Sequence, residues 1–325
     1  MTLKNNILKK LLAANGVAIS GQDLADEFQV SRTAIWKAMK ALEEEGYQIQ
    51  SVRKIGYSLE ENKDTVTAPH IQHFLKASTY GKVIHHYDSL DTTQRVAHQL
   101  ASEGATDGTL VIAEEQLQGK GRMARPWASS ASKGIWMSLI IKPTLTPQQA
   151  PQLTLVAAVS IVRAIESVCK IRPVIKWPND LLLNGKKITG ILTELQAEPD
   201  IVKAIIIGMG INVNQDRSDF PEELAEIATS LKIESGQTFN RSELVAAVLE
   251  HFEQLTTVYL TEGFNPIKTL WESYSNTIGK SIRVVMLHEI AEGQAVGITE
   301  EGMLQLKQQD GSIRLVYSGD IELKE

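Results

Sequence analysis

The feature that most restricts how this chain can fold is a glycine-rich basic stretch, QGKGRMARPW, at residues 118–127. Apolar runs at residues 109–113 and 135–141 flank it, and their composition predicts buried strands. The stretch is therefore expected to form a loop between strands. Its glycines allow the backbone to approach a ligand closely, and its cations suit a ligand that carries phosphate. Taken alone, it is equally compatible with a solvated turn.

A second polar motif, KWPND at residues 176–180, places a cation and a carboxylate on either side of a proline-stiffened turn. Taken alone, it is equally compatible with a strand end that runs into a turn. The rest of this region predicts a layered domain over residues 83–270, with a mixed sheet on one side and helices on the other. The predicted strands are 83–87, 109–113, 135–141, 174–177, 181–183, 190–195 and 204–214, and the predicted helices are 95–101, 153–170 and 241–259.

Residues 1–63 have the pattern of a small helical domain that ends in a hairpin. Apolar residues recur at helical spacing in residues 3–12, and Ser20 and Ser31 are placed to begin a second and a third helix. Alternating residues at 47–52 and 53–59 predict two strands. This order predicts a winged helix-turn-helix, whose last helix enters the major groove of DNA. The candidate DNA-contacting residues are Ser31, Arg32, Thr33, Trp36, Lys37, Arg53 and Lys54.

A protein-interaction module is the alternative interpretation of residues 1–63. The segment carries nine Lys or Arg against eight Asp or Glu, so it is not a polycation as a whole. Placement favours DNA, because cations gather at the start of the third helix and in the hairpin, whereas residues 43–45 at the far end of that helix are all Glu. The net charge of -6 argues against general affinity for nucleic acid, but not against a local basic patch.

Residues 62–69 are polar and end in a proline, which is the composition of a domain junction, so residues 64–82 are expected to be a linker. Its two histidines, His70 and His73, lack the carboxylate or cysteine neighbours of a metal site, so we expect solvated side chains and no bound metal. Residues 271–325 contain short apolar runs separated by glycine turns, and four or five such strands predict a small barrel.

The cellular location is expected to be the cytoplasm. The single cysteine, Cys169, excludes an internal disulfide and lies in an apolar helical pattern, which favours a buried, inert thiol in a reducing compartment. The first residues contain no continuous apolar core of a signal peptide. No stretch approaches the roughly 18 apolar residues of a membrane helix, so no membrane partner is expected.

The two motifs, with KITGIL at residues 187–192 and GMGIN at residues 208–212, follow the order and spacing of the biotin protein ligases, and the chain resembles that family. With its DNA-binding head it resembles the bifunctional subgroup, in which the ligase is also a biotin-responsive repressor of genes for biotin synthesis and uptake. The resemblance implies an α+β fold with a class II synthetase-like mixed sheet and an SH3-like C-terminal barrel. That barrel would either act near the ATP site and the carrier protein or serve only as packing, and the sequence leaves both open.

The implied reaction has two steps. Biotin and ATP give biotinyl-5'-adenylate and pyrophosphate, and biotin then passes to a lysine of a biotin carrier domain. The implied partners are the carrier domain of acetyl-CoA carboxylase and/or pyruvate carboxylase, operator DNA, and a second copy of the chain in a homodimer induced by biotinyl-5'-adenylate. Mg²⁺ is expected mainly on the ATP phosphates, with no protein metal ligands.

The resemblance also implies the site residues. Biotin would be held by Thr92, Thr93, Gln94, Gln116, Gly119, Lys120, Gly121, Arg122, Lys187, Gly190 and Gly208. ATP and the adenylate would be held by Arg122, Arg125, Trp127, Lys176, Asn179 and Asn212. The catalytic residues would be Lys187, Lys176, Asp180 and Arg122, with Asp180 orienting or deprotonating the acceptor lysine. The residue chemistry agrees, because acyl adenylation must offset charge on a carboxylate and a triphosphate while excluding water.

The basic loop departs from the family at two positions, with Lys120 where arginine is frequent and Ala124 where glycine is frequent. Lysine keeps the charge but loses the bidentate fork, and alanine restricts the backbone, so loop closure is expected to differ in rate. Two other functions fit parts of the sequence: a ligand-sensing transcription factor without ligase activity, and a lipoate-attaching enzyme. Intact Lys176, Asp180 and Lys187 argue against the first, and the basic loop argues against the second.

Overall fold

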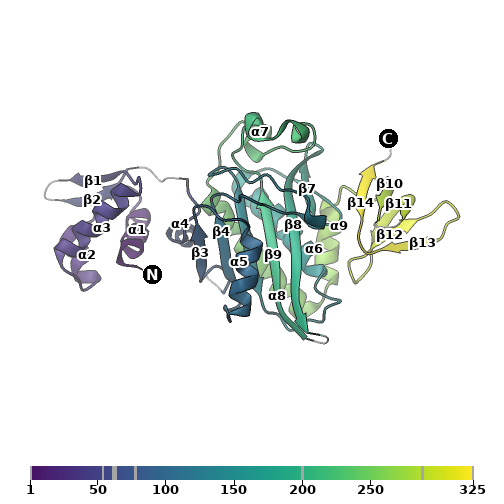
Figure 1. Cartoon of the computed structure of the whole chain (residues 1–325), viewed down its shortest axis with the longest axis horizontal. Helices are drawn as coiled ribbons and strands as arrows, with labels where there is room; N and C mark the ends of the chain where they lie inside the picture. Colours follow the sequence, from purple (N-terminus) through teal and green to yellow (C-terminus); the bar gives the residue numbers. More distant parts are fainter. Residues whose placement is uncertain are drawn as a thin grey trace.

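The computed structural model describes residues 2–52, 55–60, 64–76, 79–198, 201–286 and 289–323. Figure 1 shows three parts side by side along the longest axis: an N-terminal head, a central domain and a C-terminal sheet. The described residues thus follow the predicted α+β organisation, which is confirmed.

The head has the predicted order of elements: α1 (Leu3–Ala13), α2 (Gly21–Glu27), α3 (Arg32–Glu44), β1 (Ile49–Val52) and β2 (Gly56–Leu59). The two predicted helix caps are present, because Ser20 Oγ accepts from the Gln22 N–H at 3.1 Å and Ser31 Oγ accepts from the Ala34 N–H at 3.2 Å. The apolar faces of the helices form a separate core that includes Ile7, Leu24, Ile35, Met39 and Leu42. The candidate DNA contacts Arg53 and Lys54 lie outside the described residues.

The segment after the head is packed rather than solvated. It contains α4 (Ala68–Phe74), and Val66 and Ile71 are fully buried. The expectation of a solvated His70 is wrong, since this side chain is 1% exposed; His73 is partly buried. His70 Nδ1 is hydrogen-bonded to Thr67 Oγ1 at 2.8 Å, and its ring stacks on Tyr47 of the head. Local polarity does not reveal that α1 and the later helix α8 (Arg241–Glu262) cover α4.

The central sheet has the strand order β3-β4-β5-β9-β8-β7-β6. Strands β3 and β4 run parallel and the other described neighbours run antiparallel, so the predicted mixed sheet is confirmed. Asn184 and Gly185 both have positive φ, 49° and 82°, and form the predicted hairpin turn between β7 and β8. The bounds are β3 (Ile84–Tyr87), β4 (Thr109–Ala113), β5 (Ile135–Ile141), β6 (Val174–Lys176), β7 (Asp180–Leu183), β8 (Lys186–Glu198) and β9 (Ile201–Ile211).

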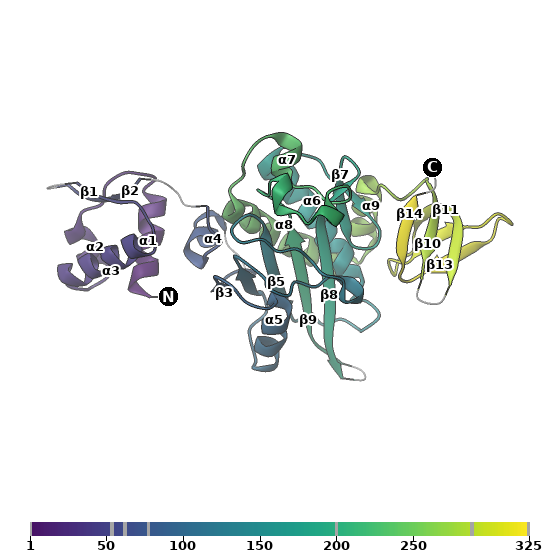
Figure 2. The same ribbon diagram turned by 45° about the horizontal axis from the view of Figure 1, so that its top comes forward.

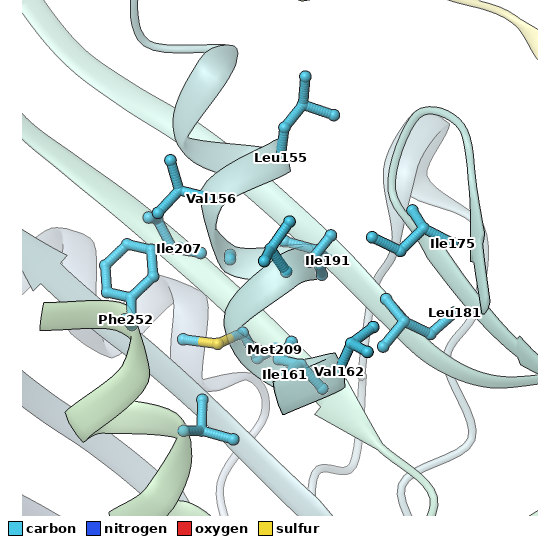
Figure 3. Packing of buried hydrophobic residues seen from close by; sticks show 14 of the residues in the cluster. Leu155, Val156, Ile161, Val162, Ile175, Leu181, Ile191, Ile207, Met209 and Phe252 are labelled. Atoms are coloured by element: carbon cyan, nitrogen blue, oxygen red, sulfur yellow. The ribbon is translucent and has the colours of Figure 1, made fainter. Parts of the chain in front are cut away.

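Helices cover both faces of this sheet. Leu110 and Ile112 of β4 belong to the main core under α6 (Gln152–Cys169) and α8 (Arg241–Glu262), part of which Figure 3 shows. Val111, between them, faces the opposite side and packs against α5 (Thr93–Ser102). Figures 1 and 2 both show α5 on one side of the sheet and α6 and α8 on the other. The expectation of helices on a single side was therefore wrong, because α5 is too short to reveal which face it covers.

Helix α6 also corrects an expectation from the sequence. Its 18 residues have a mean hydropathy of 1.5, so by length and composition the helix could cross a membrane. In the protein 72% of that window is buried in the core, as expected for a central helix of a folded domain. Cys169 at its end is buried, as predicted, and burial raises the pKa of its thiol to about 12.

The C-terminal part is an antiparallel sheet in the order β13-β12-β11-β10-β14. The last strand follows the apolar runs recognised in the sequence and brings Asp320 back toward the central domain. Helix α9 (Asn265–Tyr274) leads into this part. The strand bounds are β10 (Ser281–Val285), β11 (Ile290–Ile298), β12 (Leu304–Lys307), β13 (Ile313–Val316) and β14 (Asp320–Leu323).

Candidate functional site

A cavity of about 260 Å³ collects residues from distant parts of the sequence. Its walls come from the start of α5, the basic loop, the β5, β8 and β9 strands, the KWPND turn, the segment 220–228 and the start of β14. The predicted site residues that line it are Thr92, Thr93, Gln94, Gln116, Lys120, Gly121, Arg122, Arg125, Trp127, Asn179, Asp180, Lys187, Gly190, Gly208 and Asn212.

One end of the cavity is lined by uncharged hydrogen-bonding groups. The Thr93 N–H and hydroxyl both donate to Gln116 Oε1, at 2.9 and 3.1 Å. Ser138, fully buried in β5, lies 2.8 Å from Thr93 Oγ1 and donates to Gln94 Oε1 at 2.9 Å. Each group fixes its neighbour, so this end presents amide and hydroxyl groups in a set arrangement. It is suited to a ligand head that is polar and neutral.

The floor of the cavity is made by paired glycines. Gly190 of β8 and Gly210 of β9 are register partners, and the Trp127 indole lies against both. A Cβ at Gly210 would lie 2.5 Å from Trp127 Nε1, and one at Gly190 would lie 2.9 Å from the same ring. Only glycine leaves room for the flat indole at these two positions.

Positive charge gathers at the other end. Lys187 Nζ lies 2.7 Å from Asp180 Oδ1 and 5.3 Å from the centre of the Trp127 ring. Arg122 Nη1 donates to Asn179 Oδ1 at 3.0 Å. Burial lowers the pKa of Arg122 below its ordinary value, although nearby carboxylates oppose that shift. An arginine still carries its charge under these conditions, so this end can bind an anion.

The C-terminal sheet holds the basic loop in place. Arg125 forms an ion pair with Asp320 of β14, and Arg122 Nη2 donates to Ser318 Oγ. At the tip of the loop Met123 and Ala124 have φ values of 54° and 56°. This left-handed conformation favours glycine, so the alanine at position 124 adopts it at a cost in backbone strain.

Several lining residues were not predicted. Ser138 carried a usable signal, as the polar member of an otherwise apolar strand. Asp320 carried none, because its strand packs against the cavity only through the tertiary fold. The other unpredicted lining residues are Pro126, Ala128, Met137, Ile191, Leu192, Phe220, Leu224, Ile227 and Ala228.

Two predicted residues are not among the described residues that line the cavity: Gly119 and Lys176. A Cβ at Gly119 would lie 2.5 Å from the Trp127 carbonyl oxygen, so this glycine shapes the loop itself. Lys176 is the register partner of Asp180 across the β6–β7 pair, on the strand at the sheet edge. A contact of Lys176 with the bound nucleotide stays a prediction.

The head presents a separate polar face. Of the candidate DNA contacts on α3, Arg32, Thr33 and Lys37 are exposed, as is Ser31 at its cap. Trp36 is 51% exposed, although an indole of this size is usually covered in a folded domain. The buried residues of α3 are Ile35, Ala38, Met39 and Leu42. The face predicted to contact DNA is thus free of the head's own core.

Family models match three parts of the chain. Residues 4–58 match the HTH domain, residues 87–212 match the biotin/lipoate A/B protein ligase family, and residues 277–324 match the biotin protein ligase C terminal domain. The "Bifunctional ligase/repressor BirA" of Bacillus spizizenii is 46% identical over 322 residues, which cover 99% of each chain. The protein of the same name from Escherichia coli is 29% identical over 98% of each chain.

A solved structure of a biotin protein ligase agrees with the family match. The biotin protein ligase from Aquifex aeolicus in complex with biotin and ATP is 29% identical, with a TM-score of 0.65. The similarity covers 75% of this chain and 99% of that one.

Proposed function

Because this chain belongs to the biotin protein ligase family and matches its bifunctional ligase/repressor members over the full length, we propose that its cavity joins biotin to ATP. The protein is a biotin ligase and a DNA-binding repressor. The observation that carries the proposal for the cavity is the convergence of Lys187, Arg122 and Trp127 on one space from separate segments. A neutral polar end faces one part of that space and a cationic end faces another.

The geometry supports a direct route for the first step. The ring of biotin is neutral and polar, so the Thr93, Gln94 and Gln116 groups suit it, while its carboxylate points toward Lys187 and Arg122. These cations offset charge as a carboxylate oxygen attacks the α-phosphorus of ATP and pyrophosphate leaves. The indole of Trp127 lies on the glycine floor, and its apolar surface there helps to exclude water from the mixed anhydride that forms.

In the second step the amine of a carrier lysine attacks the acyl carbon, and an amide and AMP result. Asp180 is the carboxylate beside Lys187 and is our candidate for orienting or deprotonating that amine. Mg²⁺ would be held mainly by phosphate oxygens. The cavity carboxylates Asp180 and Asp320 are already paired with cations, and the described residues contain no group of three or more His, Cys, Asp or Glu that could hold a metal.

Replacing Asp180 with asparagine is expected to slow the transfer step more than adenylate formation. The amide keeps the shape but cannot accept a proton, and a positioned base contributes at least about 10²-fold in rate. Pyrophosphate release measures the first step, and loss of preformed biotinyl-5'-adenylate in the presence of a carrier domain measures the second. Equal slowing of both steps would show that Asp180 acts only by holding Lys187.

The repressor activity is proposed to reside in the exposed face of α3. Arg32→Ala is expected to weaken operator binding by about tenfold and to reduce the salt slope by about one, because one charged contact to DNA is lost. A gel shift at several salt concentrations measures both, with a duplex selected from random sequences by the wild-type protein in the presence of biotin and ATP. Arg283→Ala, on the C-terminal sheet, is the matched control. Wild-type affinity and slope in Arg32→Ala would contradict the assignment.

We further propose that biotinyl-5'-adenylate stabilises a homodimer that reads two half-sites, and that the carrier domain of acetyl-CoA carboxylase and/or pyruvate carboxylase competes for the same surface. A ligand drives such a change only by its higher affinity for the dimer. Sedimentation with and without the adenylate tests the dimer, and equal association constants would exclude the coupling. The expected location is the cytoplasm.

Transfer of labelled biotin is the experiment that best separates this function from its alternatives. With ATP and a carrier domain, the ligase labels the carrier covalently. A ligand-sensing transcription factor without ligase activity would bind biotin and leave the carrier unlabelled. A lipoate-attaching enzyme would label the carrier only when lipoate replaces biotin.

A further inference from the structure

The junction between the head and the central domain is built around a buried guanidinium. Arg241, the first residue of α8, is 0% exposed. Its Nε donates to Asp64 Oδ2 at 2.9 Å, and its Nη2 donates to the Asp64 carbonyl at 2.8 Å. Its Nη1 donates to Glu114 Oε2 at 2.7 Å and to the Gly134 carbonyl at 3.0 Å. The same side chain therefore holds both the segment after the head and the end of β4.

The second carboxylate oxygen of Glu114 binds the segment after the head. Oε1 accepts from Thr65 Oγ1 at 2.7 Å and from the Val66 N–H at 3.0 Å. The Glu114 carbonyl also accepts from the Ser132 N–H at 3.1 Å, where the chain returns from the basic loop. Two residues further on, Gln116 lines the cavity. Glu114 thus holds the base of the loop with its backbone and the segment after the head with its side chain.

The chain that follows β9 also contacts the junction between the head and the central domain. Asn214 Nδ2 donates to Asp64 Oδ2 at 3.1 Å, and the Asn214 N–H donates to the Lys133 carbonyl at 2.8 Å. Asn214 lies two residues beyond Asn212, which lines the cavity. Asp64 therefore contacts the chain beyond β9 directly, and it is linked to the chain beyond the basic loop through Asn214 and Arg241.

The head is coupled to this segment by packing. Beyond Val66 the chain enters α4, where His70 stacks on Tyr47 with ring centres 5.6 Å apart. Ile71 of the same helix is fully buried in the core of the central domain. A shift of the segment 64–66 would thus move a helix that is packed against both parts.

We infer that Asp64, Glu114 and Arg241 form a coupling junction, which transmits ordering of the basic loop to the position of the DNA-binding head. In the described part of the chain, none of the three lines the cavity, so they act as positioning residues. The inference rests on the proposed function, because it takes biotin and ATP as the ligands that order the loop. Arg241 and Glu114 are buried, whereas Asp64 is exposed. Because a buried charge is stable only when it is paired, a displacement of Asp64 or of residues 65–66 changes the pairing of Arg241 and Glu114. The factor by which biotin and ATP raise the affinity for DNA must equal the factor by which DNA raises the affinity for biotin and ATP.

The sharpest test uses Thr65→Val, which removes one hydroxyl hydrogen bond to Glu114 and keeps the side-chain volume. Operator affinity is measured with and without biotin plus ATP, by gel shift with the duplex selected by the wild-type protein. We expect the ligand-induced gain in affinity to fall by about 2-fold to 30-fold. Adenylate formation should stay near the wild-type rate. Thr261→Val, whose hydroxyl donates within α8, is the matched control and should keep the full gain.

If Thr65→Val keeps the full ligand-induced gain in operator affinity, the coupling junction is excluded. It is also excluded if operator binding and adenylate formation weaken together while that gain is preserved. A second measurement needs no substitution. The Val66 amide donates to Glu114, so its hydrogen exchange in the full wild-type protein should slow when biotin and ATP bind. Unaltered exchange contradicts the inference. If the wild-type protein forms no adenylate, the proposed function is wrong. The coupling inference then also fails, because it requires biotin and ATP as the ligands of the cavity.

Discussion

Replacing Lys187 with alanine is expected to reduce adenylate formation by about 10²-fold or more. The lysine ammonium lies at the cationic end of the cavity, 2.7 Å from Asp180, and removing one such electrostatic contact to a reacting anion typically has this effect. Pyrophosphate release from ATP in the presence of biotin measures the rate. Since the loss concerns charge that develops in the reaction, kcat/KM is expected to fall by more than biotin affinity does.

The neighbouring lysine provides a matched control. Lys186 precedes Lys187 in β8, is not among the described residues that line the cavity, and directs its Nζ to the Ala225 carbonyl at 3.1 Å and to Glu226. Lys186→Ala removes the same charge from the same strand, and its adenylation rate should stay within a few-fold of wild type. Wild-type turnover in Lys187→Ala, or equal losses in both variants, would remove Lys187 from the proposed mechanism.

Replacing Arg241 with methionine is expected to lower the free energy of unfolding by about 3–5 kcal/mol. The guanidinium is fully buried, and without it Glu114 keeps its charge in a poorly solvated place, while the exposed Asp64 loses its ion pair. Methionine fills much of the volume, so the loss reports on charge rather than on a cavity. Urea unfolding at pH 7 measures it. A change of less than about 1 kcal/mol would show that water or other groups replace the guanidinium.

The same variant should alter the response to acid. Burial raises the pKa of Glu114, but His86, the charge of Arg241 and hydrogen bonds from Thr65 and Val66 outweigh it, and the pKa lies well below its ordinary 4.5. A lowered pKa stabilises the fold fully above the unfolded value, and that stability is lost as pH falls below it. The stability difference between wild type and Arg241→Met should therefore shrink below pH 4.5.

The basic loop shows how far the sequence reached into the site. Its glycines and cations could be predicted to contact an anionic ligand because that chemistry is local to the stretch. The conformation at Ala124, with a φ of 56°, could not be predicted, since the C-terminal sheet and the rest of the loop impose it together. Whether Lys176 and Asn212 contact the nucleotide also stays a prediction.

His70 shows where sequence reasoning failed. It follows a polar stretch that ends in a proline and has no carboxylate or cysteine neighbour, so a solvated position was expected. In the structure the head covers one side of α4 and the central domain covers the other. The burial of a short helix depends on elements that are far away in the sequence, so it cannot be predicted from the residues of the helix itself.

The sequence by itself determined the strands, the long helices, the capped head and the composition of the ligand-binding motifs, because periodicity and turn chemistry act over a few neighbouring residues. The tertiary structure alone decided that Asp320 would meet Arg125, that α5 would cover the second face of the sheet, and that Arg241 would join Asp64 to Glu114. Each of these contacts joins residues that are far apart along the chain, so each exists only once the sheet has set the distances between them.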